Sequence, residues 1–121
     1  MSKIGYLVGA IVITTSVAAL AAPSWAADLA AAKQNYTTFC VKCHGVGGKG
    51  DGASAASLKT KPRDFTDCAR MGTLSDDLLF KVIKNGGAAN SLSGDMPAWS
   101  QGLEDDEIHS VVSFIRTFCK K

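Results

Sequence analysis

The stretch FCVKCHG, residues 39–45, places two cysteines and a histidine within five consecutive positions. Three kinds of site use such a set: a zinc site, a redox-active disulfide and a covalently attached haem. Structural zinc needs four ligands, and a redox disulfide of this spacing adjoins a βαβ unit. Haem attachment in bacteria takes place outside the cytoplasm. The rest of the chain therefore has to show which of these three kinds of site the motif forms.

The N-terminus has the layout of a secretory signal peptide. Lys3 supplies a positive charge, residues 4–22 are uncharged and mostly apolar, and the tripeptide SWA offers small residues at a cleavage site after Ala26. We therefore expect residues 1–26 to be removed and residues 27–121 to form one domain in the periplasm. Without cleavage, the apolar segment approaches the length of a membrane span and would anchor the protein.

The charge balance excludes two classes of partner. Removal of the signal takes away only Lys3, which changes the formal net charge from +2 to +1. A nearly neutral domain predicts binding neither to nucleic acid nor to an anionic membrane. All four cysteines lie in the exported part, where unprotected thiols oxidise.

Hydrophobic periodicity predicts an all-α domain with three main helices. The first is expected over residues 28–40 with Asp28 as its N-cap, and the second between an N-cap at Ser75 and a stop at residues 85–86. The third is expected over residues 104–118. Its predicted buried stripe consists of Ile108, Val111, Val112, Ile115 and Cys119.

Long glycine-rich loops join these helices. Residues 45–52 contain five glycines in eight positions, and residues 87–102 form a second long loop. Loops of this length in a small domain suggest that they wrap around something. The pattern contains no βαβ unit for a redox disulfide and no second pair of ligands near the motif for zinc.

Haem attachment accounts for each member of the motif. At the end of a helix, Cys40 and Cys43 face the same way, so both can form thioethers with vinyl groups on one porphyrin edge. His44 then lies under the iron as an axial ligand, as the C-x-x-C-H signature implies.

Met96 is the expected second axial ligand. A neutral thioether suits an iron that alternates between Fe(II) and Fe(III), and Pro97 stiffens the loop that carries it. Met71 is assigned to the core. His109 lies off the apolar stripe of the last helix and is assigned to the solvated surface.

With these motifs, the mature chain resembles a small monohaem class I cytochrome c over nearly its whole length. The resemblance implies three main helices and long loops around one covalent haem c with its iron. It also implies a helix crossing at Tyr36 and Phe114, and electron transfer without chemistry on a substrate. The matching segments are CVKCHG (40–45), GKGDG (48–52), KPRDF (61–65), DMPAW (95–99) and VVSFI (111–115).

One departure from the family pattern concerns the orientation of His44. Ala53 stands where relatives commonly have a proline, in the loop whose backbone carbonyl usually accepts the second ring N–H of the axial histidine. Two sources for that carbonyl stay open, one near Ala53 and one near Pro62.

The second departure is the pair Cys68 and Cys119, which the haem motif does not use. The family fold brings the end of the last helix toward the start of the middle helix, and an even pair in an oxidising compartment favours a disulfide. Two separate buried thiols and a redox-regulatory pair are the alternatives.

Four loop residues are candidates for contact with the haem. Phe65 and Trp99 are candidates for the pocket wall, a role that overlaps with ordinary core packing. Lys61 and Arg63 are candidates for a haem propionate, with solvated loop charges as the alternative.

The resemblance implies redox proteins as partners and a monomeric carrier that is not an enzyme. Basic residues between positions 40 and 70 predict docking to an acidic face. A haem-bearing subunit of a larger redox complex and a haem enzyme component that reduces a small molecule are the alternatives. Met96 disfavours the enzyme, because a ligated iron has no vacant position. The basic residues are Lys42, Lys49, Lys59, Lys61, Arg63 and Arg70.

Overall fold

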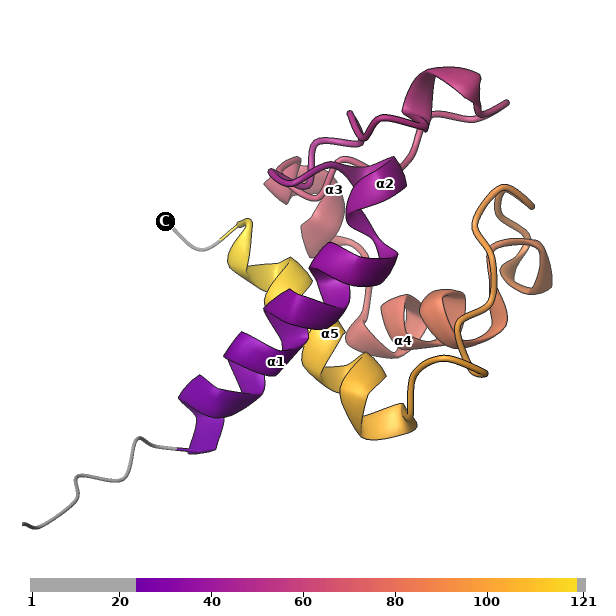
Figure 1. Cartoon of the computed structure of the whole chain (residues 1–121). Coiled ribbons are helices and arrows are strands. Elements are labelled where there is room, and N and C mark those ends of the chain that lie inside the picture. Colours follow the sequence, from indigo (N-terminus) through magenta and orange to yellow (C-terminus); the bar gives the residue numbers. More distant parts are fainter. Residues whose placement is uncertain (1–23, 120–121) are drawn as a thin grey trace, which may run out of the picture.

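The computed structural model describes residues 24–119, and the predicted signal peptide lies outside them except for its last residues. Helices and loops make up the described range, which contains no strand and no helix suited to crossing a membrane. This confirms the predicted all-α class (Figure 1). The elements are α1 (Ser24–Phe39), α2 (Val41–His44), η1 (Ala55–Ser57), α3 (Cys68–Gly72), α4 (Asp76–Asn85), η2 (Ala88–Asn90) and α5 (Asp105–Thr117).

The first helix begins earlier than predicted. Asp28 lies inside α1, so its assignment as the N-cap was wrong. The alanine-rich sequence continues on the N-terminal side of Asp28, and alanine has the highest helix propensity, so a helical start at Ser24 competes successfully. The helix ends at Phe39, and α2 follows as a separate short turn.

The other two main helices begin as the sequence predicts. Ser75 caps α4 by accepting a hydrogen bond from the N–H of Leu78 at 3.1 Å, and Gly86 ends it at φ 81°. Glu107 accepts from the N–H of Glu104 at 2.9 Å at the start of α5. The predicted stripe is buried along α5 at Ile108, Val111, Val112 and Ile115, and Cys119 is half-buried beyond its end.

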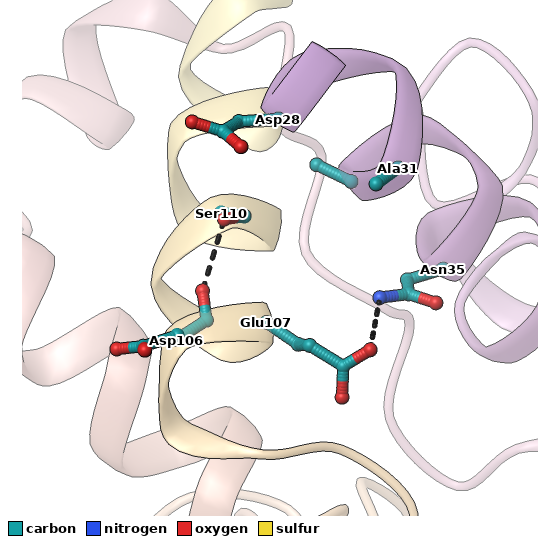
Figure 2. Close-up of a pocket in the computed structure, with 7 residues that line it drawn as sticks. Asp28, Ala31, Asn35, Asp106, Glu107 and Ser110 are labelled. Atoms are coloured by element: carbon teal, nitrogen blue, oxygen red, sulfur yellow. Dashed lines mark hydrogen bonds between the residues drawn. The ribbon is translucent and has the colours of Figure 1, made fainter. Parts of the chain in front are cut away.

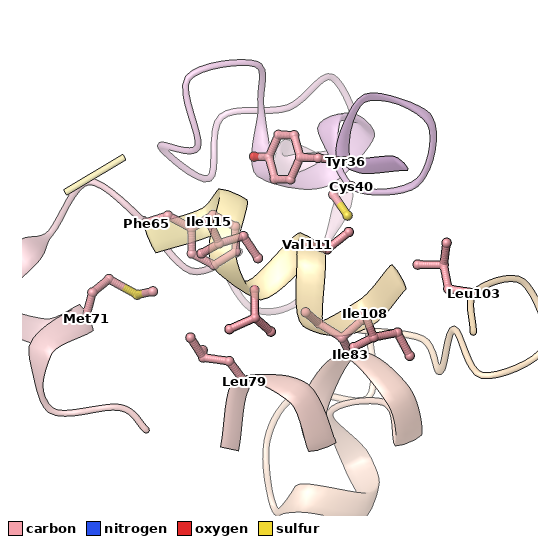
Figure 3. Close-up of a cluster of buried hydrophobic side chains, with 11 residues drawn as sticks. Tyr36, Cys40, Phe65, Met71, Leu79, Ile83, Leu103, Ile108, Val111 and Ile115 are labelled. Atoms are coloured by element: carbon pink, nitrogen blue, oxygen red, sulfur yellow. The ribbon is translucent and has the colours of Figure 1, made fainter. Parts of the chain in front are cut away.

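The core lies where α1 crosses α5, with α4 packed against α5 on the other side (Figure 1). The rings of Tyr36 and Phe114 are 5.2 Å apart, which confirms the aromatic crossing expected of the fold. Figure 3 shows the side chains of this cluster converging from these helices and from Phe65, and Met71 belongs to it as predicted.

A short helix that the sequence pattern did not predict, α3, lies beside the end of α5. Asp67 caps it by accepting from the N–H of Arg70 at 3.1 Å. Arg116 of α5 donates to the carbonyl of Met71 in α3 and to that of Leu74 just after it, and so ties α5 to α3 and to the segment before α4.

Two loops complete the fold. The first loop, residues 45–67, connects α2 to α3, and the second loop, residues 86–104, connects α4 to α5. Both contain candidate site residues.

Candidate functional site

The C-x-x-C-H motif forms a single helical turn. Cys40 directly precedes α2, and the N–H of His44 donates to its carbonyl at 2.9 Å. Neither Cys40 nor Cys43 is paired with another cysteine. Burial, and the nearby Cys43, raise the pKa of Cys40 to about 12, so it stays a thiol. Because the thiolate is the reactive form, Cys40 is not activated as a nucleophile.

The zinc alternative finds no support in the same region. Among residues 24–119, no group of three or more His, Cys, Asp or Glu side chains is arranged to hold a metal ion. Structural zinc needs four such ligands.

His44 is oriented by a backbone carbonyl. Its Nδ1 lies 3.1 Å from the carbonyl oxygen of Arg63. A carbonyl only accepts, so Nδ1 carries the proton and Nε2 keeps a free lone pair. Burial lowers the pKa of His44, which favours the same neutral form. The carbonyl therefore comes from the residue after Pro62, not from near Ala53.

Phe65 packs flat against His44. The two ring centroids are 4.5 Å apart with an interplanar angle of 14°, and Phe65 is buried. The N–H of Phe65 donates to the carbonyl of Gly48 at 2.7 Å, which fixes this part of the first loop. The sequence marked Phe65 as a candidate pocket wall, but nothing in the pattern predicted its contact with His44.

The glycine-rich part of the first loop folds back over α2. The carbonyls of Lys42, Cys43 and His44 accept from the N–H groups of Ser54, Gly52 and Gly50 at 2.9, 3.1 and 2.9 Å, respectively. At Gly52, a Cβ atom would collide with the carbonyls of Val41 and Lys42. Glycine is therefore required for this close approach.

Tyr36 secures the end of the motif from the first helix. Its hydroxyl donates to the carbonyl of Gly45 at 2.8 Å. Burial raises the pKa of Tyr36 above its ordinary value of 10.0, so the hydroxyl stays protonated and can donate.

Met96 is half-buried in the second loop and packs against the core cluster. Its carbonyl accepts from the N–H of Gly87 at 2.9 Å, next to the end of α4.

Trp99 is also half-buried, with its ring 5.2 Å from that of Phe39. His109 is exposed, as predicted, and its ring stacks on Phe80 at 4.3 Å.

Cys68 and Cys119 come together at the ends of α3 and α5. Their Cα atoms are 5.4 Å apart, and their Sγ atoms face each other at bonding range. This separation lies within the range that a disulfide spans. The predicted proximity of the two cysteines is therefore present.

A cavity of about 220 Å³ lies between α1 and the first turns of α5 (Figure 2). None of the candidate site residues lines it. The cavity exists because α1 faces α5 here with small alanine side chains. The Nδ2 atom of Asn35 donates a hydrogen bond to Glu107 across the cavity at 3.3 Å. Its lining residues are Asp28, Ala31, Ala32, Asn35, Asp106, Glu107 and Ser110.

The chemistry of the motif and the two loops fits a covalently bound haem. Two unpaired cysteines lie one helical turn apart, and a neutral, oriented imidazole follows them. A thioether sulfur is available from Met96, and an imidazole with a thioether is a known set of haem iron ligands. The hydrogen bonds of the glycine-rich loop hold the helical turn of the motif rigid. A rigid turn suits attachment of the haem through both cysteines.

Comparison with known proteins gives a family match and related sequences. The family described as "Cytochrome C oxidase, cbb3-type, subunit III" matches residues 27–115. The chain is 32% identical to a cytochrome c6 of Bryopsis maxima over 88 residues, which cover 73% of this chain and 89% of the relative. It is 30% identical to a cytochrome c6 of Tetradesmus obliquus over 89 residues, with 74% and 89% covered.

Two solved structures are similar in fold. The KustC0563 c-type cytochrome aligns with a TM-score of 0.60 at 25% identity, over 74% of this chain and 98% of that one. A chain of the Kuenenia stuttgartiensis reducing HAO-like protein complex Kustc0457/Kustc0458 aligns with a TM-score of 0.64 at 30% identity. That alignment covers 78% of this chain and 44% of the other.

Proposed function

Since this chain belongs to the cytochrome c family and carries covalently bound haem c, we propose that it is a periplasmic carrier of single electrons. In this proposal Cys40 and Cys43 hold the haem through thioethers, and His44 and Met96 are the axial ligands of its iron. The haem, when bound, supplies reversible storage of one electron as the iron alternates between Fe(II) and Fe(III).

The observation that carries the proposal is the contact between His44 and Arg63. Because Nδ1 donates to the carbonyl at 3.1 Å, Nε2 is available to a metal without loss of a proton. The same bond fixes the direction of the ring, and Phe65 restricts its tilt from one face. An oriented imidazole directly after two cysteines is what axial ligation in a c-type cytochrome requires.

Met96 supports a carrier role in preference to catalysis. If its sulfur ligates the iron, the protein leaves no open position for a small molecule. The similar cytochrome c6 proteins of Bryopsis maxima and Tetradesmus obliquus align over most of their own length, so this chain is about the size of a single such domain.

An exported location follows from the N-terminal sequence. We assign residues 1–26 to a signal peptide that is cleaved after Ala26, which leaves a monomeric domain in the periplasm. In that oxidising compartment, Cys68 and Cys119 form a disulfide, since their Cα atoms are 5.4 Å apart.

The proposed partners are redox proteins that dock through an acidic face. Six basic side chains from α2 to α3 are exposed, whereas the acidic first turn of α5 lies toward the opposite end of the molecule (Figure 1). Such a separation of charge steers an acidic partner toward the end of the molecule that carries the C-x-x-C-H motif, the motif end. The basic residues are Lys42, Lys49, Lys59, Lys61, Arg63 and Arg70.

A second candidate function is that of a haem-bearing subunit in a larger redox complex. One observation favours it: the chain aligns with 44% of a longer chain from a reducing HAO-like protein complex. Co-purification in a stable complex at native expression levels supports this alternative, and a monomer supports the carrier.

The test of the proposed function compares two methionines. In the oxidised protein, iron–sulfur ligation gives a weak absorption band at long wavelength, and Met96→Ala should abolish it. Met71→Ala is the matched control, because Met71 is a buried core residue and its loss should leave the band in place. Persistence of the band in Met96→Ala would rule out ligation by Met96.

A further inference from the structure

The carboxylate of Asp95 joins the two long loops. Its Oδ2 accepts from the backbone N–H of Lys59 at 3.0 Å and from that of Thr60 at 3.3 Å. Ser93 supports it, since its hydroxyl donates to the same oxygen at 3.2 Å. The N–H of Asp95 in turn donates to the Ser93 hydroxyl at 3.2 Å. The half-buried side chain is therefore held in one orientation.

This link lies next to both sides of the proposed site. Asp95 directly precedes Met96 in the second loop. Thr60 lies shortly before Arg63 in the first loop, and the Arg63 carbonyl orients His44. Asp95 therefore connects the first loop, which orients His44, to the second loop, which carries Met96.

Few other interactions could replace this link. Within residues 24–119, no hydrogen bond other than those of Asp95 joins the first loop to the second. The second loop is also anchored to the end of α4, where Gly87 donates to the carbonyl of Met96 at 2.9 Å. That anchor holds one edge of the loop, and Asp95 holds the edge that faces the first loop.

We propose that Asp95 is a positioning residue that keeps Met96 at the iron by latching the second loop to the first. The inference rests on the proposed ligation by Met96. A thioether is a neutral, weak ligand, so its occupancy depends on how firmly its loop is held. An external ligand competes only for molecules whose loop is open, and its apparent affinity scales with that open fraction.

The experiment measures binding of imidazole to the oxidised protein in three variants. Asp95→Ala removes both acceptor bonds, Asp95→Asn keeps an oxygen that can accept them, and Asp77→Ala removes an exposed carboxylate that pairs with Lys81. We expect imidazole affinity to rise roughly tenfold in Asp95→Ala, as loss of a charged hydrogen-bonding group shifts an equilibrium by about that factor. Asp95→Asn should largely restore the wild-type value, and Asp77→Ala should leave it unchanged.

Hydrogen exchange supplies a second readout that a general loss of stability would not reproduce. In Asp95→Ala the amides of Lys59 and Thr60 should exchange faster, while amides in the middle of α5 keep their protection. If Asp95→Ala does not fold, Ser93→Ala tests the same link, because it removes the hydroxyl that supports Oδ2. It should raise the imidazole affinity in the same direction by a smaller factor.

The outcomes separate this inference from the proposed function. A wild-type protein without the iron–sulfur band refutes ligation by Met96, and the latch with it. A wild-type protein with the band, whose imidazole affinity and amide exchange are unchanged by Asp95→Ala, refutes the latch alone. An equal change in Asp95→Ala and Asp77→Ala also refutes it, since the effect would then follow surface charge.

Discussion

The phenyl ring of Phe65 lies parallel to the imidazole of His44, with ring centroids 4.5 Å apart and an interplanar angle of 14°. Phe65 is also 6.3 Å, centroid to centroid, from Phe118 after the end of α5. It therefore connects the motif to the core formed by the helix crossing. Its backbone N–H is fixed to Gly48, so the ring has little freedom to move away.

The first prediction concerns the stability that this ring provides. Phe65→Ala should lower the free energy of unfolding by about 3–5 kcal/mol, because it deletes a buried aromatic side chain and leaves a cavity. Urea denaturation followed by circular dichroism measures the change. Phe80→Ala is the control, since Phe80 is only half-buried and stacks on the exposed His109. Equal losses in the two variants would show that Phe65 is an ordinary partly exposed contact.

Local signals made the main helices predictable. The side chain of Ser75 caps the start of α4, and the backbone conformation of Gly86 ends it. The apolar stripe on α5 has helical spacing. These features can be read from a few neighbouring residues, because capping and periodicity are local. The start of α1 was missed, since a capping residue at Asp28 has little effect when Ala26 and Ala27 before it favour helix.

The supporting contacts of the site could not be read in the same way. The group that orients His44 is a backbone carbonyl, and every residue has one, so Arg63 carries no side-chain signal. Asp95 binds amides 35 and 36 residues earlier in the chain, where no periodic pattern relates the two segments. Such contacts depend on how the loops close around the helices, which is a property of the whole fold.

The second prediction concerns the pair Cys68 and Cys119. The unfolded, unreduced mature protein should show no free thiol in a thiol titration, and two should appear after reduction. Cys119→Ser should lower the free energy of unfolding by about 4 kcal/mol at most, from the entropy of a closed loop of 51 residues. Two free thiols before reduction would contradict the disulfide. Reduced wild type is the matched reference, and it should be as unstable as Cys119→Ser.

The third prediction concerns the basic surface at the motif end. Reduction of ferricyanide, an anionic probe, should slow as ionic strength rises, because salt screens attraction beyond about 8 Å at physiological ionic strength. At low ionic strength, Lys49→Glu should reduce the rate of ferricyanide reduction below that of the wild type. Lys81→Glu is the control, since Lys81 lies on α4 outside the basic set and already pairs with Asp77. A rate that does not respond to salt, or responds equally to both variants, would count against steering by this surface.

The fourth prediction concerns the buried hydroxyl of Tyr36. Burial raises its pKa above the ordinary value of 10.0, so the folded state keeps the proton that the unfolded state releases above that pH. The stability from this group is complete below pH 10 and falls as pH rises toward the folded value, by about 1.4 kcal/mol per pH unit. Tyr36→Phe should lack this part of the decline.

Urea midpoints at about pH 9 and about pH 11 measure this difference between wild type and Tyr36→Phe, because the lysines contribute equally to both proteins. At neutral pH the variant should be about 1 kcal/mol less stable, since the carbonyl of Gly45 loses the Tyr36 hydroxyl and keeps only the N–H of Gly48 as a donor. Tyr36 is the only tyrosine in residues 27–121, so the rise of phenolate absorbance reports it directly. If that absorbance rises near pH 10 while the protein is still folded, the hydroxyl is accessible to water and the proposed role of its bond to Gly45 is wrong.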